Sequence, residues 1–184
     1  MRLIHKDQKG FTLIELLIAV AIFAVVAVAA NAVIVQIVQS NRTSSHMVAL
    51  RQVQQAGYRV NLDALQAQNI TNSTVPGSGG FPLTLNWTTW GTTWDPCKFH
   101  TVVYNLTNPS GESGELYQLE RQETVDNQTT TTVVGQYIYL GTEPPSSTQC
   151  SWNAAEKVLT LNITAMVGLE TESRTYEIKP RCSV

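Results

Sequence analysis

The chain has 184 residues, enough for one domain of ordinary size with an appendage. Apolar residues make up 43% of it and charged residues only 14%, whereas a soluble globular protein has about 25% charged residues. The net charge of −2 provides no basic surface for nucleic acid, and three cysteines exclude a disulfide-dense scaffold. The low charge content indicates a membrane segment together with a polar, uncharged surface.

A short basic segment is followed by a long apolar one. Residues 1–10 carry three basic side chains and one acidic side chain, and residues 11–30 are apolar except for Thr12 and Glu15. A helix of about 20 residues spans roughly 30 Å, the thickness of the hydrocarbon core of a bilayer. Because basic flanks stay in the cytoplasm, the sequence predicts one membrane span with the C-terminal part outside.

A cleaved secretory signal is one interpretation of this segment, because residues 27–29 and 30–32 both form small-x-small cleavage sites. The apolar run continues past both sites, however, and it contains Glu15, whose ionised carboxylate costs a few kcal/mol to insert. A plain signal anchor explains the length of the run but again leaves Glu15 without a role.

Residues 9–17, KGFTLIELL, resemble the class III signal of type IV prepilins and pseudopilins. The resemblance implies that a dedicated membrane peptidase cuts between Gly10 and Phe11 and methylates the new N-terminus of Phe11. Glu15 then becomes the fifth residue of the mature chain, where this family carries a glutamate. Many major pilins carry proline or glycine in this stretch, and residues 11–56 contain neither, which favours a minor pilin or minor pseudopilin. The end of the last expected strand, Ile178-Lys179-Pro180-Arg181, resembles the close of J-type minor pseudopilins and their minor-pilin relatives.

This resemblance implies a structural subunit, not an enzyme, of a type IV pilus-like or type II secretion pseudopilus filament. The implied partners are prepilin peptidase, other pilins or pseudopilins, the inner-membrane assembly platform and membrane lipid. In a filament, the Phe11 α-amine and Glu15 of a neighbour are both buried, and pairing them offsets both desolvation costs. The implied location is the inner membrane, in a single pass, and then the filament. A pilus, type II secretion and DNA uptake all remain open.

The helix is expected to continue beyond the membrane. Residues 41–46 suit the membrane boundary or a locally frayed region, and a stripe of apolar residues at helical spacing follows. Residues 69–80, NITNSTVPGSGG, indicate a loop. The stripe comprises Met47, Leu50, Val53, Gly57, Val60 and Ala64. The expected divisions are a leader (1–10), a transmembrane and assembly helix (11–38), its amphipathic continuation (39–68) and a β-rich domain (69–184).

The remainder of the chain shows short β-type runs rich in threonine and aromatic residues. Residues 157–167 alternate well, and residues 168–172 turn the chain back to form a C-terminal hairpin. The fold class is therefore α+β, a long N-terminal helix packed on a mainly antiparallel sheet. The expected strands are Leu83–Thr88, Phe99–Thr107, Leu116–Thr124, Thr131–Leu140, Lys157–Val167 and Arg174–Lys179.

The sequence offers little for catalysis or cofactor binding. It has no nucleophile elbow, phosphate loop, HExxH or CxxC, and its three histidines are scattered. Acidic residues near Asp95 and between Glu120 and Asp126 are candidates for calcium, but no calcium-loop pattern joins them and a solvated surface is favoured. We expect no catalytic residue, no metal and no cofactor.

All three cysteines lie in the exported part, where disulfides persist. Cys150 precedes the first strand of the expected hairpin and Cys182 follows the second, so a Cys150–Cys182 disulfide is favoured. A Cys97–Cys150 disulfide is the alternative. In the favoured pairing Cys97 is expected to be free and buried.

Three tryptophans lie in residues 85–95, LNWTTWGTTWD. Packing inside the β-rich domain is the favoured interpretation of Trp87, Trp90 and Trp94, and a sugar-stacking or adhesive patch is the other. The second interpretation supports an alternative function, a single-pass membrane-tethered extracytoplasmic binding module that forms no filament.

Overall fold

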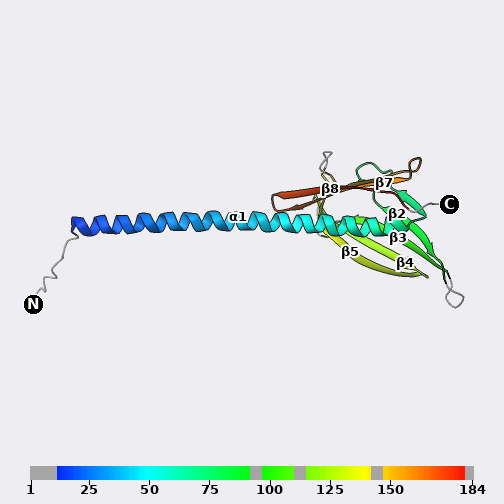
Figure 1. Ribbon diagram of the computed structural model, residues 1–184, viewed down its shortest axis with the longest axis horizontal. Coiled ribbons are helices and arrows are strands. Elements are labelled where there is room, and N and C mark those ends of the chain that lie inside the picture. Colours follow the sequence, from blue (N-terminus) through cyan, green and yellow to red (C-terminus); the bar gives the residue numbers. More distant parts are fainter. Residues whose placement is uncertain (1–11, 92–96, 110–114, 142–146, 181–184) are drawn as a thin grey trace, which may run out of the picture. The chain divides into compact units, whose positions relative to one another are not determined.

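The computed structural model describes residues 12–91, 97–109, 115–141 and 147–180. Its single described helix, α1, runs from Leu13 to Gln66 without interruption (Figure 1). The chain divides into an N-terminal unit, residues 1–43, and a globular unit, residues 44–184.

In the N-terminal unit, α1 begins directly after Thr12, whose carbonyl accepts hydrogen bonds from the N–H groups of Glu15 and Leu16 at 3.1 and 3.2 Å. The polar side chains of the helix are accommodated locally. Asn31 Nδ2 and Thr43 Oγ1 each donate to the carbonyl four residues earlier, both at 3.0 Å. Residues 41–46 are helical, so the alternative of a frayed region there is wrong. Polar side chains that hydrogen-bond back onto their own helix leave its backbone ladder intact.

In the globular unit, one stripe of α1 packs against the sheet. Val53, Gly57, Val60 and Ala64 are buried as the apolar spacing predicts, but Met47 at the start of the predicted stripe is exposed. Small side chains lie along this seam, and they allow a close approach of the sheet. A Cβ atom at Gly57 would overlap the ring of Tyr176. The buried residues of the helix are Ala49, Val53, Ala56, Gly57, Val60, Asp63 and Ala64.

The sheet has eight antiparallel strands in the order β1-β2-β3-β4-β5-β7-β6, and β8 pairs with the other edge of β7. The prediction of a long helix on an antiparallel sheet is confirmed. The strands are β1 (Asn69–Asn72), β2 (Leu83–Thr89), β3 (Lys98–Thr107), β4 (Leu116–Val125), β5 (Gln128–Tyr139), β6 (Gln149–Asn153), β7 (Val158–Val167) and β8 (Glu170–Ile178).

All six expected strands form, and so does the predicted β7–β8 hairpin. Its turn is tighter than expected, at residues 168–169, because residues 170–172 already pair with β7 as part of β8. Two strands were not predicted. Residues 69–72 were expected to lie in a loop but form β1, which pairs with β2 from Asn69↔Asn86 to Asn72↔Leu83. Cys150 precedes the hairpin as expected, but it lies inside a strand that was not predicted, β6, which pairs with β7. Both strands are short and mostly polar. They therefore form because a neighbouring strand pairs with them, and not because of their own strand propensity.

Candidate functional site

Glu15 lies in the first turn of α1 and is exposed within the N-terminal unit. A carboxylate at this position gains about 0.3–1 kcal/mol from the helix dipole, too little to account for a charge inside an apolar run. Gly10 and Phe11, the predicted cleavage and methylation sites, lie outside the described residues. Cleavage, methylation and the pairing of Glu15 with an α-amine therefore stay predictions.

Apart from Glu15, residues 13–30 of α1 are apolar on every side of the helix. A helix on the surface of a globular domain carries an apolar stripe on one side and polar residues on the other. Here large aliphatic side chains on all sides of the helix are exposed, and among the described residues α1 is long and apolar enough to cross a membrane. Its surface suits lipid or other apolar helices. The exposed large side chains between residues 13 and 28 are Leu13, Ile14, Leu16, Leu17, Ile18, Val20, Ile22, Phe23, Val25, Val26 and Val28.

In the globular unit, α1 is joined to the sheet by a buried ionic network. Asp63 accepts a hydrogen bond from the hydroxyl of Tyr104 on β3 at 2.5 Å and one from Nε of Arg121 on β4 at 2.6 Å. Nη1 of Arg121 donates to Glu123 at 2.7 Å. Asp63, Tyr104 and Arg121 are all buried. The network ties the helix to two neighbouring strands and pairs the buried charges of Asp63 and Arg121 with each other.

The pKa values in this network reflect burial and pairing. Burial, reinforced by the Asp63 charge, raises the pKa of Tyr104, so its hydroxyl stays a donor. Burial acts to lower the pKa of Arg121, but hydrogen bonds to Asp63 and Glu123 raise it overall. The hydrogen bond from Arg121 lowers the pKa of Glu123 below its usual value. Sequence reasoning missed this network, although an aspartate three residues after Val60 on the apolar stripe was a signal for it.

The network continues to the tryptophan segment. His100 Nδ1 lies 3.3 Å from Oε1 of Glu123, and the His100 ring stacks on the Trp87 ring with centroids 5.2 Å apart. Trp87 is buried, as the packing interpretation predicts, whereas Trp90 is 86% exposed and Trp94 lies outside the described residues. Glu123, one of the calcium candidates, therefore already interacts with the guanidinium of Arg121 and the ring of His100. The described residues contain no group of histidine, cysteine, aspartate or glutamate side chains placed to hold a metal ion.

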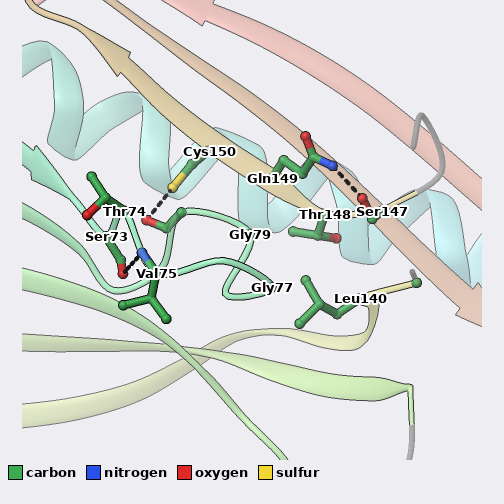
Figure 2. Close-up of a pocket in the computed structure, with 12 residues that line it drawn as sticks. Ser73, Thr74, Val75, Gly77, Gly79, Leu140, Ser147, Thr148, Gln149 and Cys150 are labelled. Atoms are coloured by element: carbon green, nitrogen blue, oxygen red, sulfur yellow. Dashed lines mark hydrogen bonds between the residues drawn. The ribbon is translucent and has the colours of Figure 1, made fainter. Parts of the chain in front are cut away.

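A polar pocket of about 520 Å³ lies between residues 73–80, the end of β5 and the start of β6 (Figure 2). Gly80 adopts φ +83° there, and a Cβ atom on it would overlap the carbonyl of Cys150. The Cys150 thiol donates to the Gly80 carbonyl at 3.0 Å, and a dashed line at the Cys150 sulfur marks this hydrogen bond in Figure 2. Burial raises the pKa of this thiol to about 12, which makes it a poor nucleophile. None of the described residues that line this pocket carries a charged side chain.

The cysteines differ in environment. Cys150 is buried, and Cys97 is exposed, so the expectation of a buried Cys97 is wrong. Cys97 directly precedes β3 and is not on the inward face of a strand. Cys182 lies outside the described residues, and the Cys150–Cys182 pairing stays a prediction. β7 lies between β6, which carries Cys150, and β8, which ends at Ile178.

Comparison with protein families gives one match. The model described as the prokaryotic N-terminal methylation motif matches residues 5–31, which include Gly10, Phe11 and Glu15. No curated protein and no solved structure matches the chain significantly. The motif implies processing by prepilin peptidase and assembly with other pilins, and its family is structural. With an apolar helix directly behind it, the signal also supports membrane anchoring. The chain thus carries the class III signal of type IV pilin-like prepilins and pseudopilins, in agreement with its long helix packed on an antiparallel sheet.

Proposed function

We propose that the chain is a minor subunit of a type IV pilus-like or type II secretion pseudopilus filament. Prepilin peptidase cuts it after Gly10 and methylates Phe11, and the mature chain stays in the inner membrane in a single pass until an assembly platform extracts it. A minor pilin or a J-type minor pseudopilin is the favoured subtype. The proposed divisions are the leader 1–10, the membrane and assembly helix 11–38, its continuation 39–68 and the β-rich domain 69–184.

The observation that carries this proposal is the methylation motif at residues 5–31, continuous with an apolar helix that exposes aliphatic side chains on every side. A cleaved secretory signal has no use for an apolar run beyond the cleavage site. A plain membrane anchor has no use for Glu15. A filament accounts for both the long apolar run and Glu15. Its core consists of stacked apolar helices, and Glu15 pairs with the α-amine of Phe11 in a neighbouring subunit.

The alternative, a membrane-tethered binding module, has one observation in its favour. Trp90 is 86% exposed and lines a groove of about 720 Å³ together with Leu62 and Leu65 of α1. An exposed indole next to threonine hydroxyls suits a sugar ring. Trp87, however, is turned into the core and stacked on His100, so the tryptophan segment presents no continuous aromatic platform among the described residues.

Replacing Glu15 by leucine separates these two functions. Glu15→Leu leaves the Gly10-Phe11 bond intact, so insertion and cleavage should proceed as in the wild type. Incorporation into filaments should fall, because the α-amine of a neighbour loses its partner, at a cost of about 3–5 kcal/mol for a well-buried pair. The measurement compares the amount of protein in membranes with the amount in sheared filaments.

Gln36→Leu is the matched control, because Gln36 is another exposed polar residue of the same apolar helix segment. This variant should assemble at the wild-type level. If Glu15→Leu also assembles at that level, the proposed pairing is wrong. If the wild-type chain is cleaved and yet never enters filaments, the tethered module is favoured.

A further inference from the structure

β5 has one edge that is almost entirely open. It pairs with β4 along its length, from Leu116↔Tyr139 to Val125↔Gln128. On its other edge the described residues provide one register pair, Ile138↔Ala165 of β7. The N–H of Gln136 donates to the side chain of Gln52 on α1, at 2.9 Å, instead of to a strand. No described backbone group pairs with this edge between residues 128 and 135.

This open edge lacks the features that usually protect a sheet from further pairing. Natural edge strands are short, or carry charges or proline. Residues 128–134 read QTTTTVV, without a charge or a proline, and the side chains of residues 128–133 are exposed. The run is β-branched and therefore suited to strand pairing. The edge strand β8 is different, because it carries the charged residues Glu170, Glu172, Arg174 and Glu177.

A cavity of about 270 Å³ lies beside this edge, between α1 and β5. Its sheet side is formed by Thr132, Val133 and Val134 of β5 together with Arg121 of β4, and its helix side by Gln55, Tyr58 and Arg59. The exposed edge thus faces a groove bounded by a helix, the arrangement in which an extended peptide adds a strand to a sheet and places a side chain in a neighbouring pocket.

Arg59 makes the groove favourable for a negatively charged group. Its Nε lies 4.0 Å from Oδ2 of Asp63, at the outer limit of an ion pair, and its side chain is 43% exposed. The same Asp63 oxygen already accepts shorter hydrogen bonds from Tyr104 and Arg121. The Arg59 guanidinium at the groove is therefore weakly neutralised and suited to a carboxylate.

We propose that residues 128–134 of β5 accept an extended, carboxylate-bearing segment of a neighbouring filament subunit by β-strand addition. Main-chain hydrogen bonds to the open edge provide the binding energy, the groove takes one side chain of the added strand, and Arg59 binds its carboxylate. The inference rests on the proposed filament function, because a filament holds subunits side by side at high effective concentration.

Two substitutions remove the proposed contacts. Thr130→Lys places a protecting charge on the edge. Arg59→Gln removes the weakly neutralised charge of the groove, since Arg121, which also lines it, is already paired with Asp63 and Glu123. Each should leave cleavage after Gly10 and the melting temperature of the full chain unchanged, and reduce recovery in sheared filaments by about tenfold, equivalent to about 1.4 kcal/mol. Thr171→Lys is the matched control, since it puts the same substitution on an exposed threonine of the charged edge strand β8, and it should assemble normally.

A photo-crosslinking amino acid at Thr132 then identifies the occupant in cells with a complete assembly system. The expected adduct joins this position to an extended, acid-containing segment of another pilin-like subunit, and Thr130→Lys reduces it by about tenfold, equivalent to about 1.4 kcal/mol. An adduct to residues 128–134 of a second copy, or no adduct in assembled filaments, would overturn the inference. Wild-type assembly by Thr130→Lys and Arg59→Gln would overturn it while the filament function stands. A wild-type chain absent from filaments would overturn both.

Discussion

Replacing Asp63 by alanine is expected to cost the globular unit a large part of its stability. Asp63 pairs with Arg121 at 2.6 Å and with the Tyr104 hydroxyl at 2.5 Å, and all three residues are buried. Removing one member of a buried ion pair costs about 3–5 kcal/mol, and an unpaired buried hydroxyl costs about 1–3 kcal/mol. Glu123 still pairs with Arg121 at 2.7 Å and offsets part of this loss. We therefore expect a decrease of at least about 3 kcal/mol in the free energy of unfolding.

The measurement is denaturant unfolding of the full chain in detergent, followed by tryptophan fluorescence. Glu177→Ala is the control, since it removes an exposed carboxylate from β8 and should change the free energy of unfolding by less than about 0.5 kcal/mol. A triple variant, Asp63→Leu with Arg121→Met and Tyr104→Phe, leaves none of these three polar groups unpaired. It should be more stable than Asp63→Ala by about 1–3 kcal/mol.

Two results would refute this reasoning. If Asp63→Ala costs less than about 1 kcal/mol, the carboxylate does not join α1 to the sheet in the way the distances indicate. If the triple variant is less stable than Asp63→Ala, the cost does not come from unpaired buried groups.

Three further predictions concern the globular unit. Gly80→Ala should destabilise it far more than Gly77→Ala, because both residues have positive φ but only a Cβ at Gly80 meets backbone; equal melting temperatures would contradict this. The pKa of Glu123 is lowered by folding, so its contribution to stability is present above the unfolded pKa and is lost as the pH falls through the folded pKa. Glu123→Gln should therefore flatten the decline in melting temperature below about pH 4.5, and an unchanged slope would refute this. Non-reducing peptide mapping should find the predicted Cys150–Cys182 disulfide, and three free thiols would exclude it.

Much of the architecture follows from local patterns. The apolar run after residue 10 and the apolar stripe that follows it together predict one helix of about the observed length, and the alternation of residues 158–167 predicts β7. A similar alternation of inward and outward side chains in β2 explains why the tryptophans differ in exposure. Trp87 shares the inward face of β2 with Leu83 and Leu85 and is buried, whereas Trp90 lies beyond the end of that strand and is exposed.

Features that depend on contacts between residues far apart in the sequence could not be predicted from local patterns. Asp63 and Arg121 are 58 residues apart, and they meet only because α1 packs over β4. The four-residue strand β1 has little strand propensity of its own and forms because β2 offers an edge. The open edge of β5 is likewise a property of sheet order, since the sequence of residues 128–134 shows a strand but not which strand lies beside it.

The most direct test of the central claim is the intact mass of the protein purified from membranes of cells that contain prepilin peptidase. The filament account predicts a chain that has lost residues 1–10 and carries one methyl group on the α-amine of Phe11. A chain that retains the leader, or one that starts at Ala30 or Val33 after cleavage at a small-x-small site, would contradict it.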